Sequence, residues 1–366
     1  MKILLVGGGS GGPVSPLLAV AAKIKTTHPK AEFLFTGSNY GPEAAMVKAE
    51  GIPFVSISSG KFRRYFSLQN FLTPFYIFAG FFGSLSILRK YKPSCVFGAG
   101  SFVQVPLIWA AWVLRIPIII HQQDIYPSLA NKLCSWLATH ITVTFEDSAL
   151  DFSTGFGLFY KKPGNKIIVT GNPFRQSLAH ASKAEAAKNF HLSGQLPVLL
   201  VFGGGTGAQA LNTLLEKSLP QLLKTVEIIH ATGMNKQKSI KSEYPQYHQY
   251  PFIKNMAEAY AAADLVLSRA GLSTITELSN LAKLSIIIPM PESHQELNGR
   301  FLSHTGSAIV LEQRDASPEL LIRIIRKVLV DGNLQKQLVN NMEKIMPRNA
   351  TENIATIVAR LAETAQ

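Results

Sequence analysis

The chain has 366 residues, of which 47% are hydrophobic and 16% charged, a composition typical of a globular protein with a large core and unlike a disordered one. A chain of this length is usually too long to fold around a single hydrophobic core, so we expect two domains. The formal net charge of +13 favours an anionic partner: nucleic acid, a phosphorylated ligand or an acidic membrane. Two cysteines exclude a disulfide framework, and the first apolar run is too short for a signal-peptide core, so we expect a cytosolic protein.

The first half of the chain predicts alternating strands and helices. Residues 3–6 form an apolar run typical of a buried strand, and a glycine loop over 7–12 and an apolar helix over 16–24 follow. Further strands are expected over 32–36, 53–56, 94–97, 116–121, 140–145 and 166–169. Continuous Ile and Val runs of this kind favour a parallel sheet that is covered on both faces.

The second half repeats this pattern. A strand over 198–202 leads into a glycine loop over 203–208 and a helix from about residue 209. Further strands are expected over 226–230, 263–267, 285–289 and 308–311, and a last helix over about 351–365. The linker is placed near 171–175, and the sequence leaves open on which domain the last helix packs. The repetition predicts two similar α/β domains.

Both glycine loops follow a strand and precede a helix. Glycine lets the backbone approach a ligand closely, and the helix behind offers free N–H groups and a positive dipole end. Neither loop matches G-x-G-x-x-G, and neither contains the G-K-[ST] of a Walker loop. Tight packing without a ligand is therefore the alternative interpretation.

Residues 268–277 combine several polar groups behind the apolar run 263–267. We expect Ser273 or Thr274 to cap a helix, with Glu277 in its first turn, where a carboxylate is favoured. Such a turn at the carboxyl end of a strand is where open α/β sheets bind ligands. An ordinary capped helix is the alternative.

Together these motifs resemble the MurG family, in order and along nearly the whole chain. Its enzymes transfer N-acetylglucosamine from UDP-N-acetylglucosamine to an undecaprenyl-linked muramyl-pentapeptide in peptidoglycan synthesis. The most specific motif is Ser-Arg-Ala-Gly-x-Ser-Thr-x-x-Glu over 268–277. The others lie at 8–12 with Pro16, 98–102, 121–124, 171–175, 203–208 with Leu211 and Asn212, 251–256, 261–264 and 294–298.

The resemblance implies an α/β fold of the GT-B glycosyltransferase type, with two Rossmann-like domains and an interdomain cleft. Residues 1–173 would form the acceptor- and membrane-facing domain, on which 350–366 can pack back, and 174–349 the UDP-sugar domain. Such a scaffold implies no cofactor and no metal ion in the chemical step, because a helix terminus stabilises the leaving diphosphate.

The resemblance also assigns roles to residues. Glu277 would accept hydrogen bonds from the ribose hydroxyls, the Ile253 backbone would read the uracil, and Arg175 would lie near the base or diphosphate. The loop residues Gly205 and Thr206 would hold the diphosphate. The sugar would be contacted by Leu272, Ser273, Thr274, His294 and Gln295. The substrate-binding set would be completed by Ser10, Gly11 and Gly12. Arg175 as a hinge surface charge and His294 as a solvated loop residue remain alternatives.

The chain departs from the family on the acceptor side. Pro13 replaces a histidine that is a general-base candidate, and the family's His-Glu-Gln-Asn reads His121-Gln122-Gln123-Asp124 here. We expect Asp124 to be the base, with His121 the second candidate. A packed structural role for His121, and helix capping near 126–128 for Asp124, are the alternatives. The chain could also be a transferase with another acceptor, or a UDP-sugar- or lipid-binding protein without activity.

Residues 71–88 are uncharged and rich in phenylalanine, and basic residues flank them on both sides. Their length suits a membrane span, but Pro74, Gly80 and Gly83 interrupt them. We expect a surface helix that enters an anionic leaflet, and a peripheral protein at the cytoplasmic face of the membrane; a buried core helix is the alternative. Because the lysines and arginines are dispersed and no recognised motif is present, we expect no nucleic-acid partner.

Overall fold

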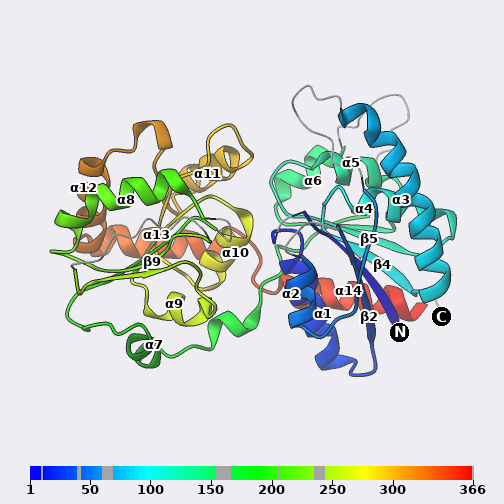
Figure 1. Ribbon diagram of the computed structural model, residues 1–366, viewed down its shortest axis with the longest axis horizontal. Coiled ribbons are helices and arrows are strands. Elements are labelled where there is room, and N and C mark those ends of the chain that lie inside the picture. Colours follow the sequence, from blue (N-terminus) through cyan, green and yellow to red (C-terminus); the bar gives the residue numbers. More distant parts are fainter. Residues whose placement is uncertain are drawn as a thin grey trace. The chain divides into compact units, whose positions relative to one another are not determined.

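The computed structural model describes residues 1–9, 11–38, 43–59, 69–153, 166–204, 207–234 and 244–364, with only the backbone for 69–74, 151 and 153. The chain forms two compact units (Figure 1). Unit 1 consists of Met1–Arg175 together with Met346–Gln366, and unit 2 of Gln176–Ile345. Each unit contains its own parallel sheet.

The sheet of unit 1 has seven strands in the order β3-β2-β1-β4-β5-β6-β7. β1 lies between β2 and β4, with Ile3 opposite Phe33 and Cys95. The strands are β1 (Lys2–Val6), β2 (Glu32–Gly37), β3 (Phe54–Ser56), β4 (Cys95–Gly98), β5 (Ile118–Gln122), β6 (His140–Val143) and β7 (Ile167–Val169). All the pairs are parallel, as the continuous apolar runs predict.

Helices cover both faces of this sheet. They are α1 (Ser15–Thr27), α2 (Glu43–Ala49), α3 (Gln69–Tyr91), α4 (Gln104–Val113), α5 (Leu129–Ser135), α6 (Glu146–Ser153) and α14 (Ala350–Thr364). Because side chains alternate along a strand, Ile3 and Leu5 pack in the core beneath α1 and α14, whereas Leu4 and Val6 pack in the core beneath α4. Both cores are therefore apolar, and the sheet between them is buried.

The C-terminal helix α14 belongs to unit 1, which resolves the question that the sequence left open. It packs beside α1, although the two helices lie at opposite ends of the chain (Figure 1). The Thr351 hydroxyl accepts a hydrogen bond from Phe174 N at 2.9 Å and donates one to Phe174 O at 3.0 Å. This pair of hydrogen bonds joins the first turn of α14 to the segment that follows β7.

Helix α3 contains the aromatic segment and packs against α4. Leu88 and Ser84 are buried, whereas Phe75, Phe78 and Phe82 are 72, 65 and 64% exposed. The alternative of a buried core helix is therefore wrong for this part of the segment. Within the described residues no helix is both long and apolar enough to cross a bilayer. The flanking Lys61, Arg63 and Arg64 lie outside the described residues.

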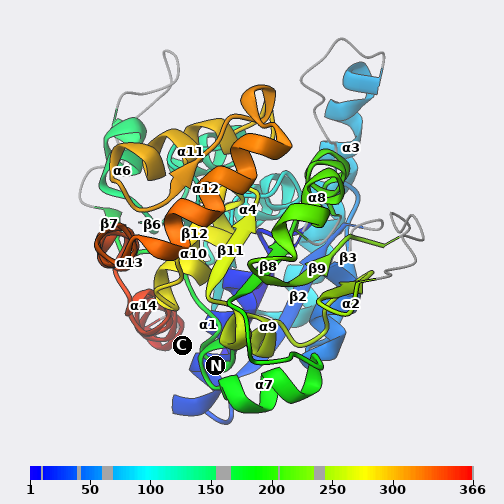
Figure 2. The same cartoon turned by 90° about the vertical axis from the view of Figure 1, so that its left-hand side faces the viewer.

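Unit 2 has a six-stranded parallel sheet in the order β10-β9-β8-β11-β12-β13. Its strands β9, β8, β11 and β12 are labelled in Figure 2. Helices α8 and α12 pack together on one side of the sheet, and α9 lies on the other (Figure 1). The strands are β8 (Val198–Phe202), β9 (Glu227–Ala231), β10 (Tyr247–Tyr250), β11 (Leu265–Ser268), β12 (Ser285–Ile287) and β13 (Ile309–Val310). The helices are α7 (Lys183–Asn189), α8 (Gln209–Leu222), α9 (Met256–Ala262), α10 (Leu272–Asn280), α11 (Gln295–His304), α12 (Pro318–Val330) and α13 (Gly332–Lys344), with short 3₁₀ turns at η2 (Gln176–Ala179) and η3 (Gln313–Asp315).

We expect the Thr351→Val substitution to lower the free energy of unfolding of unit 1 by about 1–3 kcal/mol, because it leaves the buried N–H and C=O of Phe174 without partners. Urea denaturation followed by circular dichroism measures the change. Thr356→Val is the matched control, because Thr356 is exposed on the same helix and donates only to Glu352 O. Equal stability of the two variants would contradict the role assigned to the Thr351 hydroxyl.

Candidate functional site

In unit 2 the polar loops gather at the carboxyl edge of the sheet. The two central strands, β8 and β11, are neighbours, so the glycine loop after β8 and the start of α10 after β11 leave the sheet side by side. Residues after β9, β10 and β12 reach the same edge, because all the strands run in one direction. This is the edge at which open α/β sheets bind ligands.

The start of α10 differs from the sequence prediction. The helix begins at Leu272, and its N-cap is Gly271, which provides no side-chain hydrogen bond. Neither Ser273 nor Thr274 is the cap, and Glu277 lies beyond the first turn. A side chain of another helix fixes the turn before α10 instead. Asn298 Nδ2, on α11, donates a hydrogen bond to Ala270 O at 2.9 Å. Since Gly271 has no side chain, the first-turn N–H groups donate no hydrogen bond to a capping side chain.

Glu277 is half-buried on α10. The hydroxyl of the fully buried Tyr260, on α9, donates to Glu277 Oε2 at 2.6 Å. This bond fixes the orientation of the carboxylate, and each carboxylate oxygen can accept more than one hydrogen bond. The sequence did not indicate the role of Tyr260.

Arg269 is a further residue for which the sequence suggested no role. It is 8% exposed, and its guanidinium donates to the carbonyl oxygens of Ile288 and Pro289, both at 3.0 Å, and to Gln313 Oε1 at 2.6 Å. Burial lowers the pKa of Arg269. The side chain thus joins the loop after β11 to the loop after β12 and to η3.

The second glycine loop depends on a buried polar network. Gly204 and Gly207 have φ of +85° and +68°, and a Cβ on Gly207 would collide with Thr232 O. Asn212 on α8 donates to Thr232 O at 2.9 Å, and its Oδ1 lies 3.1 Å from Nε2 of His230. Burial lowers the pKa of His230 to about 4, so this network is neutral at physiological pH.

The other residues assigned to the donor lie on neighbouring loops. Ile253 follows β10 and is buried, whereas His294 is exposed just before α11. Gln295 is half-buried, and its Oε1 accepts a hydrogen bond from Met290 N at 3.1 Å. Gly205 and Thr206 lie outside the described residues.

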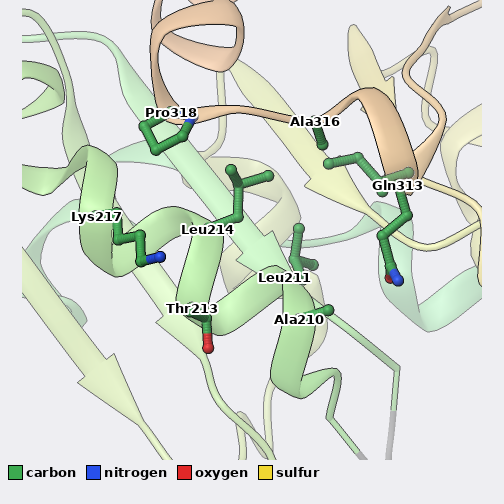
Figure 3. A pocket seen from close by; sticks show the side chains of 9 residues that line it. Ala210, Leu211, Thr213, Leu214, Lys217, Gln313, Ala316 and Pro318 are labelled. Atoms are coloured by element: carbon green, nitrogen blue, oxygen red, sulfur yellow. The ribbon is translucent and has the colours of Figure 1, made fainter.

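A cavity of about 380 Å³ opens between α8 and the η3–α12 segment (Figure 3). Leu211, Leu214 and Lys217 line it from α8, and Gln313 and Pro318 from the opposite side. None of the predicted site residues lines this cavity. It adjoins the site through Ile288 and Gln313, which line the cavity and also bond Arg269.

In unit 1 His121 lies in the core at the end of β5. It is 0% exposed, with Nδ1 2.9 Å from Thr142 Oγ1 and Nε2 2.9 Å from Asn172 Oδ1. Burial lowers its pKa to about 4, although hydrogen bonding to Asn172 and to the Thr142 backbone opposes the shift. This geometry favours the packed structural role among the two that the sequence left open.

Asp124 is half-buried in the loop that follows β5. The capping alternative is wrong, because α5 starts at Leu129 and its N-cap is Ser128, whose hydroxyl accepts from Asn131 N at 3.2 Å. The preceding Gln122 is 2% exposed and is hydrogen-bonded to this loop. Arg175, at the end of unit 1, is half-buried, as are Gly11, Gly12 and Pro13, while Ser10 lies outside the described residues.

The first glycine loop rests on Glu43, which the sequence did not indicate. Glu43 is 0% exposed, and its Oε1 accepts hydrogen bonds from Gly9 N at 3.1 Å, from Ser38 N at 2.9 Å and from the Ser38 hydroxyl. A Cβ on Gly8 would collide with this oxygen. Desolvation is the largest influence on the pKa of Glu43 and raises it, but the hydrogen bonds together hold the pKa below its ordinary value.

Within the part of the chain that the structure describes, no three His, Cys, Asp or Glu side chains are grouped so as to hold a metal ion. The polar groups at both sheet edges are instead suited to hydrogen bonding, with loop N–H groups, hydroxyls and carboxylates. Such groups can bind sugars, phosphates and hydroxyl-bearing acceptors.

Comparison with known proteins identifies the class. Residues 3–143 match the glycosyltransferase family 28 N-terminal domain, and residues 198–359 match the glycosyltransferase family 28 C-terminal domain. The MurG structure of Acinetobacter baumannii is 26% identical and superposes with a TM-score of 0.73, covering 98% of this chain and 99% of that one. The fold is therefore the GT-B fold, and the protein is a glycosyltransferase of family 28.

Two curated relatives narrow the class. The UDP-N-acetylglucosamine–N-acetylmuramyl-(pentapeptide) pyrophosphoryl-undecaprenol N-acetylglucosamine transferase of Clostridium kluyveri is 34% identical over 98% of this chain and 99% of its own length. Its counterpart from Clostridium perfringens is 36% identical over 99% of this chain and 98% of its own length. The chain belongs to the MurG family of transferases.

We expect Glu43→Gln to lower the free energy of unfolding of unit 1 by about 1.5–3 kcal/mol at neutral pH, because hydrogen bonds to a charged acceptor become neutral ones. The folded-state pKa lies below the unfolded one, so this contribution is complete above the unfolded pKa and is lost as the pH falls through the folded pKa. The difference in unfolding free energy between wild type and variant should therefore become smaller at acid pH.

Urea denaturation at a series of pH values tests this expectation, with Glu50→Gln as the control because Glu50 is exposed next to α2. A difference that stays constant down to strongly acid pH would mean that the charge of Glu43 does not hold the loop.

Proposed function

We propose that the protein transfers N-acetylglucosamine from UDP-N-acetylglucosamine to an undecaprenyl-linked muramyl-pentapeptide, converting lipid I to lipid II in peptidoglycan synthesis. The observation that carries this proposal is 34–36% identity to transferases of that description over nearly the full length of both chains. The placement of the candidate substrate residues supports it, since the described ones follow parallel strands at the carboxyl edges of the two sheets.

In this proposal unit 2 binds the donor. Glu277, oriented by Tyr260, accepts hydrogen bonds from the ribose hydroxyls, and the Ile253 backbone reads the uracil edge. Arg175 is assigned to the base or diphosphate by the family resemblance. The sugar is contacted by Leu272, Ser273, Thr274, His294 and Gln295.

The second glycine loop, including Gly205 and Thr206, holds the diphosphate of the donor. Its backbone and the uncapped N-terminus of α8 present N–H groups and a positive dipole end to the phosphates. When the glycosidic bond to UDP breaks, negative charge grows on the departing phosphate. The same N–H groups stabilise that charge, which is electrostatic catalysis without a metal ion.

Unit 1 provides the acceptor chemistry, with Ser10, Gly11 and Gly12 in the loop that contacts the acceptor. The acceptor hydroxyl attacks the anomeric carbon from the side opposite UDP, inverts that centre and loses its proton. Pro13 and Gln122 cannot accept this proton, and both ring nitrogens of His121 are engaged in the core. Asp124 is therefore assigned as the general base.

A transferase with a different acceptor is the second candidate. The observation that favours it is the pattern of departures: Pro13, Gln122 and Asp124 differ from the family on the acceptor side, whereas the motif over 268–277 is intact. A UDP-sugar- or lipid-binding protein without activity would bind the donor but would not turn it over.

An assay with radiolabelled UDP-N-acetylglucosamine and a lipid-linked muramyl-pentapeptide separates these candidates. We expect label in the lipid product. Donor turnover only with a different lipid-linked acceptor would support the second candidate. UDP binding without turnover with any acceptor would contradict a transferase.

We expect Glu277→Ala to weaken UDP binding by about 1–3 kcal/mol, since the ribose hydroxyls lose a charged acceptor. Isothermal calorimetry measures the affinity. Glu319→Ala is the control, because Glu319 is an exposed carboxylate on α12 of the same unit. Unchanged UDP affinity in Glu277→Ala would refute the ribose assignment.

The acceptor lipid implies contact with an anionic membrane surface, and we assign this contact to α3 and its neighbours at the cytoplasmic face. Phe75, Phe78 and Phe82 are exposed on α3, and Arg89 and Lys90 lie in its last turn. Trp112 and Trp136, on and beside α4 and α5, are about half exposed, with ring centroids 5.6 Å apart. Exposed aromatic rings with basic residues are typical of peripheral membrane binding, and no nucleic-acid partner is proposed.

We expect the double substitution Phe75→Ser with Phe78→Ser to reduce binding to anionic liposomes by about 10²-fold or more, since each phenylalanine contributes about 1.5–3 kcal/mol when buried. Co-sedimentation with vesicles measures binding, and high salt should also weaken it. Val330→Ser, an 84% exposed apolar position of unit 2, is the control. Release only by detergent would contradict interfacial binding.

A further inference from the structure

We propose that Gln122 is the positioning residue of the acceptor site, because its amide shapes the loop 123–128 and thereby sets the place of Asp124. This inference rests on the proposed role of Asp124 as general base. Gln122 is the last residue of β5, and Asp124 follows it by two positions. The sequence presented Gln122 only as the loss of a carboxylate.

The Gln122 amide uses its full hydrogen-bonding capacity. Its Nε2 donates to Asp124 O at 2.8 Å and to Tyr126 O at 2.9 Å. Its Oε1 accepts from Ser128 N at 3.3 Å and from Asn131 Nδ2 at 2.6 Å. A primary amide has two donors and two principal acceptor sites, so this side chain is saturated. The loop is thus wrapped around one buried amide, which is 2% exposed.

The two donated bonds require an amide at this position. An ionised carboxylate has no N–H to give and would place a buried negative charge against two carbonyl oxygens. An apolar side chain would leave the Asp124 and Tyr126 carbonyl oxygens without these bonds. The chain therefore combines an amide at 122, where a donor is needed, with a carboxylate at 124, where a proton must be accepted.

Neighbouring side chains hold this arrangement from outside. Asn131 also donates to His121 O at 3.0 Å, and its Oδ1 accepts from Gln104 Nε2 at 2.6 Å. On the other side, the Ser148 hydroxyl lies 3.2 Å from Asp124 O and 2.7 Å from Ile125 O. The Asp124 carbonyl thus receives hydrogen bonds from β5 and from α6, which fixes its backbone while the side chain stays half-buried at the edge of the sheet.

The test uses the full-length protein with the variants Gln122→Met, Asp124→Asn, the double variant and Gln335→Met. Gln335 is the matched control: its Nε2 likewise donates to two carbonyl oxygens, Val328 O at 2.8 Å and Leu329 O at 3.0 Å, but in unit 2. The measurements are kcat, the two KM values, UDP affinity, melting temperature and amide hydrogen exchange.

We expect Asp124→Asn to lower kcat by about 10²–10⁴-fold. Gln122→Met should lower kcat by about 10²-fold, since misplacing a catalytic group by about 1 Å has this effect. Both should leave UDP affinity unchanged, whereas Gln335→Met should lower only the melting temperature. Because Gln122 acts through Asp124, adding Gln122→Met to Asp124→Asn should lower kcat by less than about twofold further.

Two further readouts separate positioning from a general loss of structure. In Gln122→Met, hydrogen exchange should accelerate over 124–128 while the strands of unit 1 stay protected; this measurement needs no turnover. In Gln122→Glu, a neutral carboxylic acid still donates one bond and a carboxylate donates none, so kcat relative to wild type should fall as the pH rises.

The failures are distinguishable. Wild-type kcat in Asp124→Asn would overturn the base and, with it, this inference. An inactive Asp124→Asn beside a fully active Gln122→Met would overturn the inference alone. Additive losses in the double variant, or unchanged exchange over 124–128, would reduce Gln122 to a purely structural residue and would also overturn it.

Discussion

Everything at the candidate site depends on parallel strand pairing. Because the strands of each sheet run in one direction, loops from distant parts of the sequence leave at a common edge. In unit 2 this brings together the glycine loop after β8, the start of α10 after β11 and Ile253 after β10. The strands themselves supply no chemistry. They fix where each loop begins, and the loop residues supply the N–H groups, hydroxyls and carboxylates.

The position of a strand end does not by itself fix the conformation of the loop that follows. In both units, buried polar side chains fix that conformation through hydrogen bonds to the loop backbone. Glu43 holds the first glycine loop, Gln122 the loop of Asp124, and Arg269 the loops after β11 and β12. Each of these side chains forms hydrogen bonds with backbone groups of the loop that it holds. The glycines remove the Cβ atoms that would occupy this space, as at Gly8 against Glu43. The buried side chains that pack under the loops thus determine the shape of the site.

The sequence predicted the alternating strands and the two strand–loop–helix units because these depend on local apolar runs and glycines. It missed β10, whose residues Tyr247–Tyr250 are polar and aromatic with no apolar run. It misplaced the cap of α10, because Ser273 and Thr274 have the better capping side chains but the chain turns earlier, at Gly271. It gave no signal for Glu43 or for the donor bonds of Gln122, since these arise from tertiary contacts that no local pattern encodes. The departures at Pro13 and Asp124 were visible in the sequence, but the buried geometry of His121 was not.

The membership of α14 in unit 1 has a consequence for biosynthesis. A ribosome produces the seven strands of unit 1 first, then all of unit 2, and only afterwards the helix that covers α1 and shields Ile3 and Leu5. Domains generally fold in the order in which they emerge. Unit 2 can therefore complete its core while unit 1 still exposes the apolar groove beside α1. During that interval the nascent chain has an uncovered hydrophobic surface, which closes only when residues 350–364 leave the exit tunnel.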